Sequence, residues 1–491
     1  MAALMIQGCG SDVGKSVLVA GLCRAFTNRG LTVRPFKPQN MSNNAAVTQP
    51  DENGLIGEIG RAQALQAIAC RTAPTVHMNS ILLKPQSDTG AQLVVRGQVE
   101  GHWKASIYQQ RKAALLEIVL DSFERLHSEA DLVIVEGAGS PAEINLREGD
   151  IANMGFARAA HVPVVLVGDI DRGHVIAALV GAKAVLDPED AAMIHGFIIN
   201  KFRGDPSLFD LGREQIAELT GWHDLGMVPW LTEACRLPAE DAVVLQKTSE
   251  DPPQGKVRIA VPMLSRIANF DDFDPLAADP NLDLQFVPPG QTIPVDSDWI
   301  ILPGTKATIA DMTFLKAQGW DIDILSHVRR NKRVLGICGG YQLLGRHIHD
   351  PHGVEGEVRS CRGLGLLDVE TTLHPTKTLK QVSGQVASCG SDFTGYEIHV
   401  GQTFGADTER PVALISGQPH GATSPHGLAQ GLYIHGVFDS PKARAGLLGL
   451  TGAGQQAPDH ATVVDAALDA IAATLEQHLD LEHLYQLASR K

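Results

Sequence analysis

Cysteine is sparse in this chain, and its spacing does not suit disulfides or structural zinc. The seven cysteines among 491 residues are odd in number and widely scattered, and no C-x-x-C occurs. Scattered single cysteines are typical of proteins in a reducing compartment, where disulfides rarely persist. The sequence therefore predicts a cytoplasmic protein without a disulfide framework or a zinc site.

Long apolar runs and an excess of positive charge are also missing. No apolar stretch approaches the length of a membrane span, and the N-terminus lacks the basic flank of a signal peptide, so neither feature is expected. The formal net charge of −15 disfavours a nucleic acid or an anionic membrane as partner. The hydrophobic content of 44% is high enough for large cores, and the length suggests roughly two to four domains.

A glycine-rich segment near the N-terminus has the context of a phosphate-binding loop. It follows the apolar run 3–6, which predicts a buried strand, and it precedes 17–22, which predicts the start of a helix. Glycines let backbone N–H groups turn toward phosphate oxygens, and a helix N-terminus adds partial positive charge there. Lys15 would reach the terminal phosphates, and the Ser16 hydroxyl would bind Mg²⁺.

The spacing of this loop is a variant of the common G-x-x-x-x-G-K-[ST] pattern. Cys9 stands where the pattern has its first glycine, and Gly8 lies one residue earlier. A glycine-rich turn that binds nothing is the alternative, which the flanking strand and helix disfavour. The candidate phosphate-binding residues of the loop are Gly8, Gly10, Ser11, Asp12, Val13, Gly14, Lys15 and Ser16.

A carboxylate ends the next strong strand signal. The continuous apolar run 131–136 predicts a buried parallel strand that finishes in Glu136. A carboxylate at the end of a strand beside a phosphate loop can complete the oxygen shell of Mg²⁺. A helix-capping or solvated glutamate is the alternative.

Strands and helices alternate through the rest of the first half. The runs 162–171 and 195–201 repeat the strand pattern and carry Asp171, Asn200 and Lys201 at their ends. Such alternation predicts an α/β fold with a doubly wound, mostly parallel sheet.

A polar segment at 38–44 follows the strand predicted at 32–37 and is predicted to be a loop. Open α/β sheets bind ligands at the carboxyl ends of their strands, although an ordinary surface loop is the alternative. The candidate substrate-binding residues at this edge are Lys37, Gln39, Asn40 and Asp171.

Four segments of the first half together resemble the glutamine-dependent cobyric acid synthase family. They are residues 8–16, 36–41, 135–145 and 168–173. This half is also similar to dethiobiotin synthetase, whose phosphate loop has the same displaced first glycine. The resemblance implies that Lys15, Ser16 and Glu136 hold ATP and Mg²⁺. It also implies that Asn200 and Lys201 lie at the adenine-contacting position.

A polar stretch at 246–256 predicts a linker between two domains. We therefore expect a first domain at 1–245, which the resemblance implies binds ATP and a corrinoid, a second α/β domain at 257–443 and a helical tail at 444–491. Apolar residues of the tail recur at helical spacing between 460 and 487. This spacing predicts a helix docked on a core rather than a membrane or partner segment.

Cys338 stands in the outline of a nucleophile elbow, after a strand predicted at 333–337 and before a predicted helix. The glycines that follow let a substrate carbonyl approach the backbone, and the helix N-terminus favours the thiolate and stabilises an oxyanion. A cysteine nucleophile also needs a base, and His435 at the end of another apolar run is the candidate. A buried structural cysteine and a structural histidine are the alternatives.

Residues 336–342 and 433–438 resemble the Triad-type class I glutamine amidotransferases. Most of these relatives carry Glu two residues after the histidine, where this chain has Val437, so the third member of the triad stays unassigned. The resemblance implies that Gly304 and Gly339 serve the oxyanion and glutamine site. Residues 396–399 match a further motif of the same branch.

Three histidines near residue 350 could suggest a metal site. His347, His349 and His352 flank an Asp-Pro pair, however, and a surface turn is the preferred interpretation.

Together the resemblances imply an ATP- and glutamine-dependent amide ligase of cobalamin biosynthesis. Its partners would be glutamine, ATP and a corrinoid, adenosylcobyrinic acid a,c-diamide, amidated at carboxylates b, d, e and g. Cobyrinic acid a,c-diamide synthase or a more distant glutamine-dependent amide ligase is the alternative. A dimeric partitioning ATPase fits less well, because it would carry Lys in place of Gly10 and would not need Cys338.

Overall fold

The computed structural model describes residues 2–52, 54–85, 90–238, 256–356, 360–450 and 459–490. The chain divides into two compact units. Unit 1 comprises Met1–Ser42, Thr48–Pro238 and Val464–Lys491, and unit 2 comprises Asn43–Val47 and Ala239–Val463. The linker predicted at 246–256 lies outside the described residues except for Lys256.

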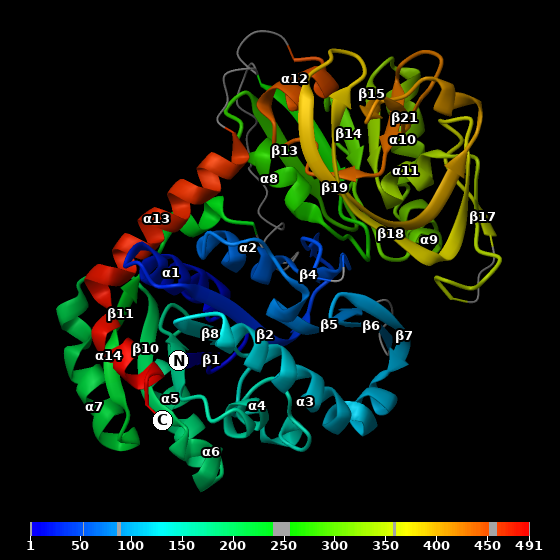
Figure 1. Ribbon diagram of the computed structural model, residues 1–491. Helices are drawn as coiled ribbons and strands as arrows, with labels where there is room; N and C mark the ends of the chain where they lie inside the picture. The colour runs from blue at the N-terminus through cyan, green and yellow to red at the C-terminus, as the bar shows by residue number, and fades with distance from the viewer. Residues whose placement is uncertain are drawn as a thin grey trace. The chain divides into compact units, whose positions relative to one another are not determined.

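Unit 1 is built on a nine-stranded sheet (Figure 1). Its strands follow in the order β11 (His223–Pro229), β10 (Ile194–Phe202), β9 (Val164–Asp169), β1 (Ala2–Gly8), β8 (Leu132–Glu136), β2 (Val33–Met41), β5 (Asn79–Pro85), β6 (Gly90–Val95) and β7 (Gln98–Lys104). The strands from β11 to β5 run parallel, and β6 and β7 continue the sheet antiparallel at one edge. The doubly wound, mostly parallel sheet predicted from the sequence is confirmed.

Helices cover both faces of this sheet, which explains why its central strands are continuously apolar. One layer contains α1 (Lys15–Asn28), α13 (His460–His478) and α14 (Leu481–Ala488), and the other contains α3 (Ala105–Ser128), α4 (Met154–Ala159) and α5 (Val175–Val185). Leu4 and Ile6 of β1 pack with the first layer, whereas Ala3 and Met5 pack with the second. Successive side chains of a strand point to opposite faces, so a strand covered on both sides needs no polar alternation.

The C-terminal helices belong to the core of unit 1. A Cβ atom at Gly21 of α1 would lie 2.6 Å from Leu475 Cδ1 and 2.7 Å from Ile471 Cγ2, so α13 approaches α1 closely. The docked helix predicted from the apolar spacing is confirmed. Within the parts of the chain that the structure describes, no helix combines the length and apolar character needed to cross a membrane.

Unit 2 contains two sheets. The first has the order β13 (Leu282–Val287), β12 (Val257–Pro262), β14 (Trp299–Leu302), β15 (Arg333–Ile337), β23 (Ala429–Leu432) and β22 (Ala422–Thr423), and only β22 is antiparallel to its neighbour. The second has the order β17 (Ser360–Arg362), β16 (His347–His349), β18 (Glu370–Val386), β19 (Asp392–Phe404) and β24 (Ile434–His435), with β20 (Ala413–Ile415) and β21 (Gln418–His420) beside β18. The parallel first sheet positions the elbow at the carboxyl end of β15.

The other α-helices and strands of the described residues complete the two units. In unit 1 they are β4 (Glu58–Gly60), α2 (Arg61–Ala69), α6 (Pro188–Ala192) and α7 (Asp210–Thr220). In unit 2 they are β3 (Ala45–Val47), α8 (Asp274–Ala277), α9 (Thr308–Ala317), α10 (Trp320–Arg329), α11 (Gly339–Leu344) and α12 (Pro441–Leu448).

Two local predictions were wrong. The loop predicted at 38–44 begins later, because β2 continues to Met41 and pairs Gln39 with Ile81 of β5. Likewise, His347 and His349 lie in the strand β16, whereas His352 does lie in a turn as predicted. In both places backbone pairing with a neighbouring strand outweighs the polar local sequence.

Truncation of Leu475 tests how much the docked helix stabilises unit 1. Leu475 is fully buried, so Leu475→Ala should lower the free energy of unfolding by about 2–5 kcal/mol. Urea titration followed by hydrogen exchange of β1 and α1 peptides measures the change. Leu219→Ala on α7, where the leucine is 61% exposed, is the control and should change stability by less than about 0.5 kcal/mol. Equal effects of both substitutions would contradict the docking.

Candidate functional site

The phosphate-loop segment forms a tight turn between β1 and α1. Gly14 has φ +92°, and a Cβ atom there would lie 2.4 Å from Asn200 Nδ2, so only glycine fits. A Cβ atom at Gly8 would lie 2.5 Å from Val13 Cγ2. Asp12 is also left-handed, with φ 58°. These conformations leave α1 to begin at Lys15 with its N-terminus facing the loop.

Lys15 folds back over this loop. Its Nζ donates hydrogen bonds to the carbonyl oxygens of Gly10, at 2.9 Å, and Gly139, at 3.1 Å. The ammonium group is therefore held between the loop and the segment after β8, where phosphates would sit. Burial raises the pKa of the neighbouring Cys9 thiol to about 12, although the positive charge of Lys15 acts in the opposite direction. Cys9 is therefore a neutral thiol.

Glu136 is the shared partner of three groups from different elements. Its Oε1 accepts hydrogen bonds from Ser16 Oγ at 2.7 Å and from Lys37 Nζ at 2.8 Å, and its Oε2 accepts one from Gln66 Nε2 at 2.5 Å. The carboxylate is 1% exposed. A hydroxyl and a carboxylate oxygen side by side form the donor set that Mg²⁺ prefers, so these residues fit the metal.

Asn200 and Lys201 support the loop from β10. Asn200 Nδ2 donates to the carbonyl oxygen of Val13 at 2.7 Å. Lys201 Nζ donates to the carbonyl oxygen of Asp12 and pairs with Asp169 Oδ2 at 2.9 Å. The side chains of this pair therefore fix the backbone of the loop.

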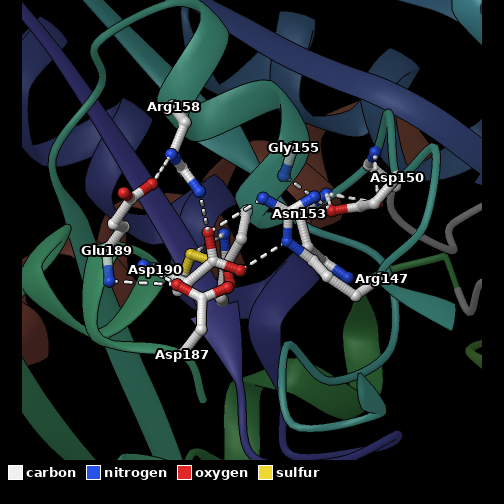
Figure 2. A network of polar contacts seen from close by, with 11 residues as sticks. Arg147, Asp150, Asn153, Gly155, Arg158, Asp187, Glu189 and Asp190 are labelled. Atoms are coloured by element: carbon white, nitrogen blue, oxygen red, sulfur yellow. Dashed lines mark hydrogen bonds and ion pairs between the residues drawn. The ribbon is translucent and has the colours of Figure 1, made fainter. Parts of the chain in front are cut away.

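The segment after β8 is held in place by a polar network (Figure 2). The side chain of Asn153 makes two hydrogen bonds to the backbone of Ala138. Its Nδ2 donates to the carbonyl oxygen at 2.5 Å, and its Oδ1 accepts the N–H at 3.1 Å. Asp150 accepts hydrogen bonds from the N–H groups of Asn153 and Gly155 at the start of α4. The buried Asp190 pairs with two arginines, Arg147 and Arg158, and ties this segment to α6.

A small polar cavity lies beside this network. Its volume is about 100 Å³, and its lining includes Gln39, Lys112, Ser140, Glu143, Arg147 and Asp150. Of the substrate candidates, Lys37 contacts Glu136 and Gln39 lines this cavity. Asn40 instead donates to Gln63 Oε1 at 3.0 Å, and Asp171 pairs with Arg203 at 2.8 Å near the surface.

Cys338 lies in a strained turn between β15 and α11 in unit 2. Its backbone has φ 52° and ψ −110°, a conformation that costs about 1–3 kcal/mol for a residue other than glycine. Its N–H donates to the carbonyl oxygen of Leu432 at 2.8 Å. A Cβ atom at Gly340 would lie 2.1 Å from the carbonyl oxygen of Leu302, so the turn requires glycine there.

His435 and Asp272 form a hydrogen-bonded pair near this cysteine. Asp272 Oδ2 lies 2.7 Å from His435 Nδ1, and Asp272 Oδ1 accepts the N–H of Gly436 at 2.8 Å. Burial lowers the pKa of His435, but the Asp272 carboxylate and the neighbouring Cys338 outweigh burial and raise it to about 9. An imidazolium at neutral pH is a suitable partner for a thiolate.

Asp272 was missed by sequence reasoning. It lies in the short 3₁₀ turn Phe270–Phe273, far along the chain from His435, so no spacing connects the two residues. The sequence feature that could have pointed to it is the pair of adjacent aspartates between two phenylalanines. The structure buries both aspartates.

Gly304 and Gly339 also lie at this centre. A Cβ atom at Gly304 would lie 3.4 Å from His435 Cε1 and 3.8 Å from Cys338 Cβ, and one at Gly339 would lie 2.5 Å from Thr305 Cγ2. Tyr396 stacks on the imidazole of His435 with ring centroids 5.2 Å apart. Backbone N–H groups near a cysteine can stabilise an oxyanion.

The fold and these two centres define a class of protein. Unit 1 has a P-loop nucleotide-binding fold, and unit 2 has a glutamine amidotransferase fold in which Asp272 pairs with His435 near Cys338. Residues 4–244 match the family model described as the CobQ/CobB/MinD/ParA nucleotide binding domain. Residues 258–443 match the model of the CobB/CobQ-like glutamine amidotransferase domain.

Full-length relatives identify the family. The chain is 63% identical to the cobyric acid synthase of Caulobacter sp. (strain K31) over 99% of its length and 100% of the relative's. It is 60% identical to that of Paracoccus denitrificans (strain Pd 1222), again over 99% and 100%. It is 58% identical to that of Rhizorhabdus wittichii, over 99% of both chains. The chain belongs to the cobyric acid synthase family, whose members are glutamine-hydrolysing ligases of cobalamin biosynthesis, and the resemblance seen in the sequence is confirmed.

Neutralising Glu136 tests its contact with Mg²⁺. Glu136→Gln keeps the shape but removes the charge, so activity should fall and the Mg²⁺ concentration for half-maximal activity should rise by about tenfold or more. Glu136→Gln also removes the charged partner of the buried Lys37. Ser16→Ala is therefore a milder second variant, and it should shift the Mg²⁺ titration in the same direction. Glu129→Gln, on an exposed carboxylate of another segment, is the control. Unchanged Mg²⁺ titrations in both site variants would show that the pair is structural.

Asp272 should set the alkaline limit of glutamine hydrolysis. The imidazolium of His435 is lost as pH rises through about 9, and removing the carboxylate that raises this pKa should move the loss to lower pH. We expect Asp272→Asn to reduce kcat/KM by about two to four orders of magnitude and to shift its alkaline limb downward. The release of glutamate across a pH series measures both. Asp271→Asn in the same turn is the matched control, and an unmoved limb in Asp272→Asn would exclude Asp272 from the triad.

Proposed function

We propose that this enzyme uses ATP and glutamine to amidate carboxylates b, d, e and g of adenosylcobyrinic acid a,c-diamide, giving adenosylcobyric acid. The observation that supports it most is the presence of two distinct centres in one chain of this family. One gathers Lys15, Ser16 and Glu136 beside a phosphate loop, and the other gathers Cys338 and His435. Activation of a carboxylate and release of ammonia are the two steps that such an amidation needs.

In unit 1 the acceptor carboxylate would take the γ-phosphoryl group of ATP. The charge of Lys15 would stabilise the transferred phosphoryl group, and loop N–H groups would orient the phosphates. Ser16 and Glu136 would hold Mg²⁺, which neutralises phosphate charge when it is bound. Ammonia would then displace phosphate from the acyl phosphate and leave the amide.

In unit 2 the Cys338 thiolate would attack the carboxamide carbon of glutamine. The N–H groups of Gly304 and Gly339 are the proposed donors to the oxyanion, and His435 would give its proton to the departing ammonia. Water would then hydrolyse the thioester to glutamate. Asp272 would hold the imidazole in the orientation that both steps need.

The polar cavity beside the segment after β8 is the proposed subsite for the acceptor. Gln39 lies in its lining, and Lys37 approaches Glu136 next to the phosphate loop. Asn40 and Asp171 would contact the acceptor only after leaving their present partners, Gln63 and Arg203. We place the reaction in the cytoplasm, because all seven cysteines are free thiols and fit a reducing compartment.

The rival functions differ in measurable ways. A cobyrinic acid a,c-diamide synthase would amidate carboxylates a and c, so mass spectrometry of the product from each corrinoid distinguishes it. A partitioning ATPase is disfavoured by Gly10 at the place of its signature lysine and by the cysteine centre of unit 2.

A donor-swap experiment tests the division of labour between the two centres. Cys338→Ser should lose glutamine-dependent amidation, yet keep ATP-dependent amidation at high ammonium and raised pH, because free ammonia is the same nucleophile. Lys15→Ala should lose amidation by about 10²-fold or more with either donor. The corrinoid amide formed by each purified variant is the measurement. Retained glutamine use by Cys338→Ser, or normal ammonia use by Lys15→Ala, would overturn the proposal.

A further inference from the structure

A short segment early in the chain packs inside unit 2, close to the cysteine centre. Asn43–Val47 is grouped with unit 2, although the residues on both sides of it belong to unit 1. Asn44 Oδ1 accepts the backbone N–H of Asn269 at 2.7 Å, and the carbonyl oxygen of Ala45 accepts Asn269 Nδ2 at 2.8 Å. Asn44 is 1% exposed and Asn269 is 2% exposed, so these bonds are shielded from water.

Asn269 begins the turn that carries the catalytic carboxylate. It adopts the left-handed conformation with φ 53°, and its carbonyl oxygen accepts the N–H of Asp272 at 3.2 Å. Asp272 in turn holds His435. The position of Asn269 therefore fixes the start of the turn and, through it, the orientation of the imidazole.

Asn269 and the residue before it also reach two other parts of the centre. Its Nδ2 donates to the hydroxyl of Tyr396 at 2.9 Å, and the ring of Tyr396 stacks on His435 at an interplanar angle of 18°. Ala268, the preceding residue, donates its N–H to the carbonyl oxygen of Gly304 at 2.9 Å. Two adjacent residues, Ala268 and Asn269, thus join the turn with the carboxylate, the tyrosine stacked on the imidazole and the glycine proposed to serve the oxyanion.

We propose that Asn44 is a positioning residue for glutamine hydrolysis, and that Asn43–Val47 makes this hydrolysis responsive to ligands bound in unit 1. The segment follows β2 directly, and β2 carries Lys37, which contacts Glu136 at the phosphate loop. A shift of β2 when the acceptor or nucleotide binds is passed along the backbone to Asn44 and then to Asn269. The ligand-responsive part rests on the function proposed above, whereas the positioning part needs only the cysteine centre.

Removing the amide of Asn44 tests the positioning role. Asn44→Ala leaves the buried N–H of Asn269 without its acceptor, whereas Asn44→Asp keeps an oxygen at the same place. We expect Asn44→Ala to lower kcat for glutamate release by about 10- to 100-fold with little change in KM, and Asn44→Asp to recover most of it. Ammonia-dependent amidation should be unchanged in both variants.

Two further variants separate positioning from a loss of folding. Tyr396→Phe keeps the stacked ring and removes the hydroxyl bonded to Asn269, so kcat should again fall while thermal unfolding stays close to the parent. Asn331→Ala, in the same unit at the opposite end of β15 from Cys338, is the matched control and should keep the parental kcat. An unchanged kcat in both Asn44→Ala and Tyr396→Phe would overturn the positioning role, as would equal losses with glutamine and with ammonia.

The response to ligands is read from the ratio of glutamate-release rates with and without ATP plus corrinoid. This ratio should exceed one in the parent and fall close to one in Asn44→Ala. A parent ratio of one, or the parental ratio in Asn44→Ala, would overturn the response. Because glutamate release by itself needs no corrinoid, a wrong corrinoid assignment would leave the positioning result intact. It would show as absent amide product in the parent, so the ratio is measured with a corrinoid that the parent amidates.

Discussion

The buried carboxylate of Glu136 is the constraint on which the organisation of unit 1 depends. An ionised side chain that is 1% exposed is stable only beside compensating groups, and here they come from α1, α2 and β2. β8 lies between β1 and β2 in the sheet, so its carboxyl end is reached from both sides. The strand order thus brings the phosphate loop after β1 and the lysine of β2 to a single oxygen.

In unit 2 the corresponding constraint is the pairing of Asp272 with His435. A buried histidine stays protonated at neutral pH only if a nearby carboxylate raises its pKa by more than burial lowers it. The 3₁₀ turn after β12 supplies this carboxylate for His435. The more common source, a glutamate two residues after the histidine, is replaced by Val437, which is buried. In this chain the carboxylate that pairs with the histidine therefore comes from a distant part of the sequence, and arrangements defined by roles rather than by sequence order allow this.

Much of the fold and part of the site followed from local sequence. The buried strands of unit 1 were visible because they are apolar on both faces, and the phosphate loop and elbow were visible because glycines surround Lys15 and Cys338. The end of β2 could not be predicted from local sequence, because its polar residues form a strand through their pairing with β5. Asp272 and Asn44 were invisible for another reason: each acts on a residue distant in sequence, and no periodicity or spacing encodes such a contact.

The discontinuity of unit 1 has a consequence for how the protein is made. The helices α13 and α14, which cover the apolar face of α1, are translated only after all of unit 2. During synthesis the first sheet therefore emerges early but waits with the side of α1 around Gly21 and Arg24 uncovered, while the second unit can close its own core. The part of the polypeptide that leaves the ribosome first is thus the part whose core is completed last.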